Sequence, residues 1–130
     1  MTRQEAFNYV VKGLLSQLHP SVEMRHGHPG CLYRGGAEIR CGVGWLIPDS
    51  MYCSSMEHMG IDEVLDNFPA LGGAFKLSLF TRQELMLLQQ YHDDAAIKFC
   101  REGNLASDWQ RFIREALANF AADSNLKMEV

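Results

Sequence analysis

Cys41, His92 and Asp93 are the residues of this sequence whose types best suit nucleophilic chemistry. Cys41 comes just before an apolar segment that is expected to form a helical turn, and the N-terminus of a helix lowers the pKa of a thiol. In this hypothesis of a cysteine-dependent hydrolase or transferase, His92 or else His58 is the base and Asp93 orients the imidazole. We favour a structural interpretation, in which His92 is a hydrogen-bonded core residue, because it lies on an apolar helical stripe.

Two cysteines and two histidines suggest a metal site as a second hypothesis. Cys31 and Cys41 are expected on paired strands, and His26 and His28 lie in the segment before them. Thiolates and imidazoles are the ligands that Zn²⁺ takes in tetrahedral sites. The chain has no C-x-x-C pair, however, and buried free cysteines are common, so a protein without a cofactor is the favoured prediction. Spare ligands for such a zinc-stabilised structural domain are Cys53 and His58.

Methionine and aromatic residues in two irregular segments predict a surface that binds another protein. Such side chains adapt to the shape of a partner and are enriched in interfaces. The structural alternative is that they fill irregular gaps in the core of a small domain. The predicted binding residues are Met51, Tyr52, Met56 and Met59 in the first segment, and Phe75 and Phe80 in the second.

Composition and charge disfavour several classes of function. The chain has 130 residues and a net charge of −4, and its 12 Lys and Arg residues are spread along it, which disfavours direct binding of nucleic acid. No apolar run is long enough to span a bilayer, and the N-terminus has no secretory signal. We therefore expect a cytoplasmic protein whose 4 cysteines are thiols or metal ligands more often than disulfides.

Two helices are expected where a capping box precedes an amphipathic stripe. Thr2 with Glu5, and Thr81 with Glu84, have the spacing at which the two residues satisfy each other's backbone N–H groups. Gly13 lies inside the first of these helices, and it weakens that helix by roughly 1 kcal/mol relative to alanine.

The remaining pattern predicts a mostly helical α+β single domain over residues 1–130. A short amphipathic helix is expected from 61 to 68, and the clearest apolar stripe of the chain follows Ser107, which is the expected cap. Residues 20–30 are expected to form a loop. The tail from about 124 to 130 is predicted to be disordered.

One β-hairpin, covered by the amphipathic helices, is expected over about residues 31–41. Two short strands flank a Gly-Gly dipeptide, which favours a tight turn. A two-residue turn gives one register, and a three-residue loop gives another that pairs Arg34 with Glu38 and Cys31 with Cys41. We favour the second register, because it places opposite charges and apolar groups across from each other.

The order and spacing of three segments resemble a family of small uncharacterised proteins of bacteriophages, prophages and their hosts. The segments are CLYR at 31–34, CGVGWLIPD at 41–49 and LQQYHD at 88–93, which follow the family pattern CLYR, CxxGxLIPD and LQxxHD. The resemblance covers most of the chain. It implies a mobile-element protein that acts inside a bacterial cell, and it assigns no activity. The His-Gly-His stretch at 26–28 and Trp45 are not features of this pattern.

The favoured hypothesis is a phage-type protein without catalysis of its own, which binds another macromolecule in the bacterial cytoplasm. The expected partner is a host or phage protein. A role in modulating a host process, such as the inhibition of a defence system, is implied by the resemblance and not by the residues.

Overall fold

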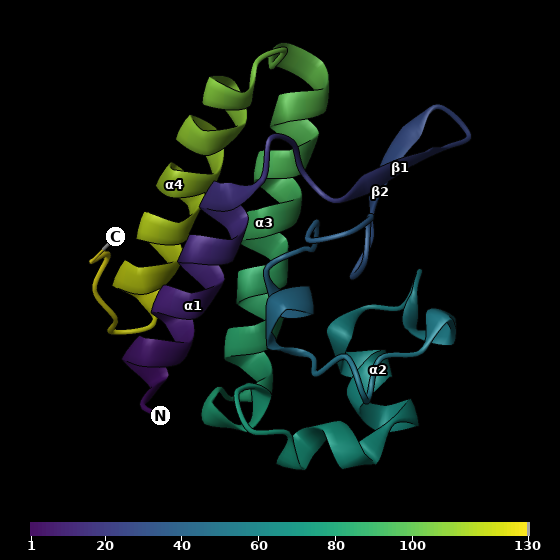
Figure 1. The fold of residues 1–130 in the computed structure, drawn as a ribbon, viewed down its shortest axis with the longest axis vertical. Coiled ribbons are helices and arrows are strands. Elements are labelled where there is room, and N and C mark those ends of the chain that lie inside the picture. The colour runs from purple at the N-terminus through teal and green to yellow at the C-terminus, as the bar shows by residue number, and fades with distance from the viewer. Residues whose placement is uncertain (130) are drawn as a thin grey trace.

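Three helices pack side by side and enclose the larger part of the core (Figure 1). In the computed structural model, which describes residues 1–129, they are α1 (Arg3–Ser16), α3 (Arg82–Glu102) and α4 (Ala106–Asp123). The helices α3 and α4 form an antiparallel pair, and α1 lies against α4. The ring centroids of Phe7 and Phe120 are 5.7 Å apart, so aromatic packing joins α1 to α4.

Both predicted capping boxes are present. The hydroxyl of Thr2 accepts from the backbone N–H of Glu5 at 3.1 Å, and the carboxylate of Glu5 accepts from the N–H of Thr2 at 2.9 Å. Thr81 and Glu84 repeat this arrangement at the start of α3, with distances of 3.1 and 2.9 Å. The starts of α1 and α3 therefore follow directly from the sequence.

The helix α4 begins at Ala106, and its start differs from the prediction. The carboxylate of Asp108 accepts from the backbone N–H groups of Leu105 at 3.0 Å and Asn104 at 3.1 Å. A carboxylate in the first turn satisfies these donors and also suits the helix dipole. The prediction of Ser107 as the cap is therefore wrong, and Ser107 lies exposed within the first turn.

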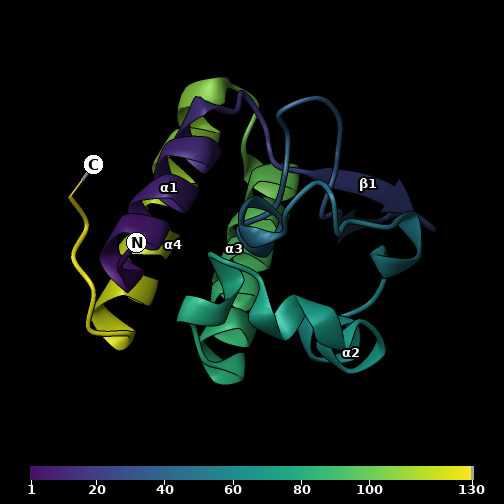
Figure 2. The same ribbon diagram turned by 60° about the horizontal axis from the view of Figure 1, so that its bottom comes forward.

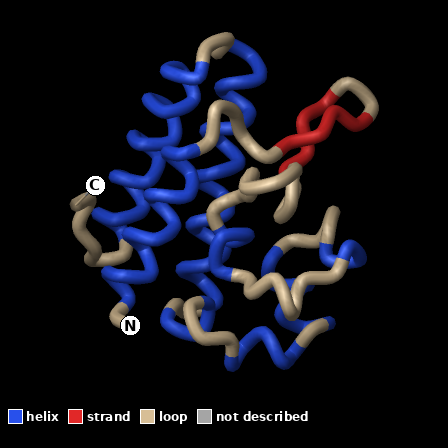
Figure 3. The backbone as a smooth tube through the Cα atoms, in the orientation of Figure 1, coloured by secondary structure: helices blue, strands red, loops and turns tan. Residues whose placement is uncertain are grey.

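The β-hairpin lies earlier in the chain than predicted. Strand β1 (Val22–Arg25) pairs antiparallel with β2 (His28–Cys31), and the pair projects from the body of the molecule (Figure 3). His26 and Gly27, which join the strands, have φ angles of 52° and 80°. Positive φ at both central residues is the conformation of a type I′ turn, whose twist matches that of the strands. The prediction that residues 20–30 form a loop is therefore wrong.

Residues 31–41 form a tight turn with a single bridge instead of the predicted hairpin. The bridge pairs Gly36 with Ile39, and the N–H of Gly35 donates to the carbonyl of Ile39 at 2.8 Å. Cys31 pairs with Val22 across the hairpin, so the expected pairing of two cysteines on opposed strands is also wrong. The first strand of the predicted hairpin is unavailable because Cys31 already ends β2.

Short helical segments cover the face of α3 that α1 leaves free (Figures 1 and 2). They are η1 (Val43–Leu46), η2 (Ser54–Met56), α2 (Ile61–Asn67), η3 (Pro69–Gly73) and η4 (Leu77–Leu79). Of these, α2 matches the predicted amphipathic helix to within one residue. The chain follows an irregular path from η1 to η4, because glycines and turn residues interrupt the sequence before a long amphipathic stripe can form.

The predicted fold class is confirmed, because the described chain is mostly helical and its one sheet is a two-stranded hairpin. None of the helices in residues 1–129 combines the length and apolar character needed to cross a membrane. The C-terminal tail, for which disorder was predicted, makes hydrogen bonds with α1. The backbone N–H of Lys127 donates to the side-chain oxygen of Gln4 at 2.9 Å, and the side-chain amide N–H of Gln4 donates to the carbonyl of Lys127 at 2.7 Å. The last residue, Val130, lies outside the described residues.

Candidate functional site

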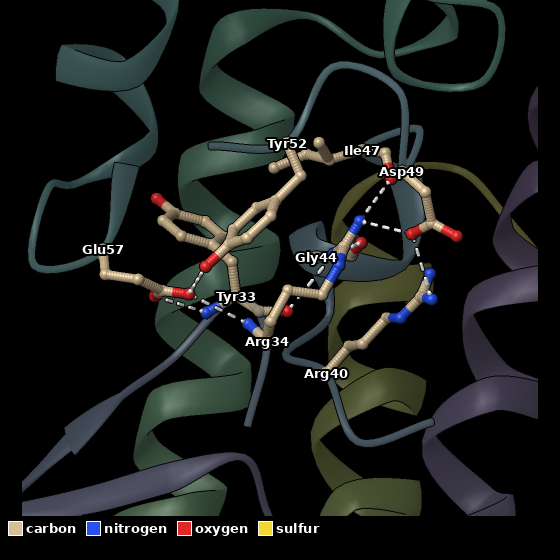
Figure 4. Close-up of polar contacts among 8 residues, drawn as sticks. All are labelled: Tyr33, Arg34, Arg40, Gly44, Ile47, Asp49, Tyr52 and Glu57. Carbon is tan, nitrogen blue, oxygen red and sulfur yellow. Dashed lines mark hydrogen bonds and ion pairs between the residues drawn. The ribbon is translucent and has the colours of Figure 1, made fainter. Parts of the chain in front are cut away.

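Arg34 holds together the irregular segment between the hairpin and α2 (Figure 4). Its guanidinium donates to the carbonyls of Gly44 at 2.7 Å and Ile47 at 2.9 Å, and to the carboxylate of Asp49 at 3.1 Å. Ile47 is the residue that follows the last turn of η1, where helical hydrogen bonds run out, and Gly44 lies within that helix. The guanidinium also lies 4.8 Å from the ring centroid of Tyr52. Arg34 therefore fixes one side of a polar cluster on the surface.

Glu57 fixes the other side of this cluster (Figure 4). Its carboxylate accepts from the backbone N–H groups of Tyr33 at 2.8 Å and Arg34 at 3.1 Å, and from the hydroxyl of Tyr52 at 2.6 Å. Burial and the hydrogen bond to this carboxylate raise the pKa of Tyr52 to about 12. Tyr52 therefore remains a hydrogen-bond donor throughout the physiological range of pH.

Arg40 and Trp45 form the part of the cluster that faces α1. The indole N–H of Trp45 donates to the side-chain oxygen of Gln17 at 2.9 Å, and the backbone N–H of Arg40 donates to the same oxygen at 3.1 Å. The Arg40 guanidinium stacks 4.8 Å from the Trp45 ring centroid and pairs with Asp49 at 3.1 Å. Gln17, a buried residue at the end of α1, therefore sets the positions of both side chains.

The two guanidinium groups of this cluster pair with one carboxylate, that of Asp49, because Glu57 accepts from backbone N–H groups and from Tyr52 instead. Arg34 and Arg40 are each only 14% exposed, yet they share one carboxylate, Asp49, which is 76% exposed. Burial and the nearby Arg40 lower the pKa of Arg34, which shows the mutual repulsion of the two guanidinium groups. In addition, Nε of Arg40 is buried and has no hydrogen-bond partner among the described residues. The hydrogen-bonding capacity of the two guanidinium groups is therefore not fully used among the described residues.

A hollow of about 230 Å³ opens beside Arg40. We call its functional part the cationic–aromatic recess, which consists of Tyr9, Arg40, Trp45, Phe75 and Lys76. The ammonium of Lys76 lies 4.4 Å from the ring centroid of Tyr9, and the rings of Tyr9 and Trp45 meet edge to face at 5.9 Å. The recess therefore offers two cations, each supported by an aromatic ring.

The predicted partner-binding residues separate into two groups. Met56 is 0% exposed and Phe80 is 7% exposed, so neither contributes to a binding surface, and the prediction is wrong for these two. Apolar side chains of short helical segments fill the core here, as the structural alternative proposed. Three others are partly buried and pack against the same core, namely Met51, Tyr52 and Met59. Phe75 alone of the six is strongly exposed, and it belongs to the recess.

The predicted catalytic residues are not arranged for nucleophilic attack by Cys41. His92 Nδ1 and an oxygen of Asp93 are 3.2 Å apart, so the expected pair is present. Cys41 is 1% exposed, and its sulfur accepts from the N–H of Gly44 at 3.3 Å within η1. Burial nevertheless raises the pKa of Cys41 to about 12, which opposes formation of a thiolate. The helical turn after Cys41 is therefore present without the activation that the sequence suggested.

The four predicted zinc ligands are not brought together either. His26 and His28 are exposed near the tip of the hairpin, whereas Cys41 is buried two residues before η1. Within residues 1–129, the one group of three potential ligands with close donor atoms is Cys31 with His92 and Asp93. The structure thus places Cys31 with the two residues that the sequence had suggested as partners of Cys41.

The thiol of Cys53 is expected to react faster than the other three. It is exposed, and a hydrogen bond with Ser55 lowers its pKa, whereas burial raises the pKa of Cys31, Cys41 and Cys100. Titration with an aromatic disulfide at neutral pH should show one fast thiol, reacting more than about a hundredfold faster than Cys41. Cys53→Ser should remove this phase. A fast phase that survives Cys53→Ser would contradict this assignment, and the double variant Cys53→Ser, Cys100→Ser then tests whether the exposed Cys100 or the buried Cys41 causes it.

The recess could not be recognised from the sequence, since its residues come from three separate segments. Tyr9 lies on α1. Arg40 comes before η1 and Trp45 lies within it, whereas Phe75 and Lys76 come directly before η4. The local signals were Phe75, which was among the predicted binding residues, and Trp45, an aromatic residue in an otherwise aliphatic segment. Comparisons with known proteins add no constraint: no family model, no curated protein and no solved structure matches this chain.

Proposed function

We propose that this protein is a non-enzymatic binding protein, which uses the cationic–aromatic recess to bind an acidic segment of a partner protein. The observation that carries the proposal is the pair of largely buried guanidinium groups of Arg34 and Arg40, which share the exposed carboxylate of Asp49. Asp49 supports the proposal because its largely exposed carboxylate is the kind of group that an acidic partner would present to these guanidinium groups. A carboxylate of the partner would occupy the adjacent hollow between Arg40 and Lys76.

The aromatic residues of the recess favour a protein segment over a small free anion. Phe75 is 64% exposed and Tyr9 is 37% exposed, and both lie at the edge of the hollow. Exposed aromatic rings beside buried arginines are typical anchors of protein interfaces. An acidic segment that also carries an apolar side chain would contact both parts of the recess.

The overall negative charge of the chain does not oppose such binding. At physiological ionic strength the Debye length is about 8 Å, so distant carboxylates are largely screened from a ligand in the recess. Within the hollow, the two cations Arg40 and Lys76 outnumber the one carboxylate, Asp49, that also lines it. We expect binding to weaken as salt is added, because the attraction is electrostatic.

The biological setting that we propose follows from the sequence resemblance. A phage or prophage protein of this kind would bind a host or phage protein in the bacterial cytoplasm and modulate a host process, with defence inhibition as one case. A hollow of about 560 Å³ beside Arg111 and Glu115 supports this role less well, because no aromatic residue lines it.

Lys76→Glu is expected to weaken binding of an acidic partner by about tenfold or more, which corresponds to 1.4 kcal/mol. The probe is a fluorescent peptide of alternating Asp and Leu residues, measured by anisotropy at low salt, with an Asn-Leu peptide as its neutral counterpart. Phe75→Ala should also weaken binding, because it removes the exposed ring.

Lys98→Glu is the matched control for this experiment. Lys98 also lies over an aromatic ring, 4.6 Å from the centroid of Phe112, but on another face of the molecule, where it lines a different hollow. The control should bind the peptide as the unmodified protein does. Equal loss of affinity in both variants, or equal affinity for the neutral peptide, would contradict the proposal.

A further inference from the structure

Three potential metal ligands converge where the hairpin meets α3. Cys31 is the last residue of β2, and His92 and Asp93 lie near the middle of α3, which contacts β2. One donor atom from each side chain lies within 4.8 Å of the other two. None of these residues belongs to the recess, so the cluster is independent of the proposed binding function.

The geometry is that of a ligand set and not of a catalytic relay. In a relay, the imidazole lies between the thiol and the carboxylate and uses one nitrogen for each. Here, His92 Nδ1 contacts Asp93 at 3.2 Å, and Nε2 is buried without a hydrogen-bond partner. Cys31 interacts with Asp93 instead of taking a position at the far nitrogen. The three side chains therefore face a shared point.

The distances also suit a tetrahedral ion. Bonds of about 2.0 to 2.3 Å at tetrahedral angles place neighbouring ligand atoms about 3.3 to 3.8 Å apart. The 3.2 Å separation of His92 Nδ1 and Asp93 is close to this spacing, and the 4.8 Å limit for the whole group requires only small movements. Asp93 is 37% exposed, so its side chain has room to move.

A fourth position is accessible from solvent. Cys31 and Asp93 both line a hollow of about 290 Å³, whose other lining residues include His58 and Gln89. His92 is completely buried behind them. An ion could therefore enter from the hollow and retain a water molecule on that side, as in zinc sites that have three protein ligands.

We propose that Cys31, His92 and Asp93 bind one divalent transition-metal ion of the zinc class. Thiolate and imidazole are the ligands that distinguish such ions from Mg²⁺ and Ca²⁺, which take oxygen ligands. Binding replaces the thiol proton of Cys31, which passes to solvent, while His92 coordinates as the neutral imidazole. A divalent ion with one thiolate and one carboxylate forms a neutral centre, which suits a largely buried site.

Titration with Co²⁺ tests this site in protein purified without a histidine tag. We expect one equivalent to bind and to produce a sulfur-to-cobalt charge-transfer band, which Zn²⁺ then abolishes by displacement. Cys31→Ser should remove the band, and Asp93→Asn should weaken binding by at least about tenfold. Near-ultraviolet circular dichroism confirms that both variants are folded.

The controls separate this cluster from the other thiols and imidazoles. Cys53→Ser and the double variant His26→Gln, His28→Gln should bind Co²⁺ as the unmodified protein does, because these residues lie outside the cluster. The absence of a charge-transfer band with one equivalent of Co²⁺, or a band that persists in folded Cys31→Ser, would overturn the proposal.

Discussion

Glu57→Ala is expected to lower the free energy of unfolding by about 3 kcal/mol. A hydrogen bond to a charged group contributes about 1.5 to 3 kcal/mol, and Glu57 accepts three of them, from two backbone N–H groups and from the hydroxyl of Tyr52. Partial exposure of the carboxylate reduces the sum. The change also leaves the N–H groups of Tyr33 and Arg34 without their acceptor, so the segment that holds Arg34 should loosen.

Chemical denaturation followed by far-ultraviolet circular dichroism measures this loss. Glu102→Ala is the matched control, because it removes the same charge from an exposed position at the end of α3. Glu57→Gln should fall between the two, since an amide retains one acceptor oxygen but loses the charge. The proposed role of Glu57 would be incorrect if Glu57→Ala and Glu102→Ala had the same stability.

The helices of this protein could be predicted because their signals are local. The capping boxes at Thr2 and Thr81 and the apolar stripe of α4 lie within single elements, and all three helices occur where these signals placed them. The error at Ser107 has a local cause as well. Asp108, one residue further, can satisfy the same backbone donors with a charged group.

The hairpin was misplaced because two turn signals compete in this part of the sequence. The Gly-Gly dipeptide at 35–36 is a stronger signal than His26-Gly27, and Pro29 and Gly30 argue against a strand. In a two-stranded sheet both strands are edge strands, however, so the missing N–H of Pro29 costs little. The histidine then adopts the positive φ of the first turn position.

The candidate sites could be predicted only in part, since they depend on contacts between distant segments. The contact between His92 and Asp93 could be expected because the two residues are adjacent in sequence. Their contact with Cys31 depends instead on how β2 docks on α3. The position of the hairpin along the chain determines which cysteine contacts α3. In the hairpin predicted at residues 31–41, Cys31 and Cys41 are paired, so the sequence could not distinguish which of them would contact this helix.

Gly13→Ala is expected to destabilise the protein by about 2 kcal/mol, although helix propensity alone predicts a gain of about 1 kcal/mol. A Cβ atom at Gly13 would lie 2.5 Å from two atoms of the Trp45 indole and 2.9 Å from a third. The buried ring cannot move away without losing its hydrogen bond to Gln17 and its stacking with Arg40. The loss should therefore exceed the gain in helix stability.

The same substitution should also weaken peptide binding to the recess, because Trp45 forms one of its walls. Thermal unfolding gives the stability change, and the shift of tryptophan fluorescence reports the displaced ring. Gly72→Ala provides the comparison, since a Cβ there meets no atom within 4 Å and should leave stability and binding nearly unchanged. A Gly13→Ala protein that is more stable than the unmodified chain would show that Trp45 does not pack on α1, and the recess would then lose the residue that positions Arg40.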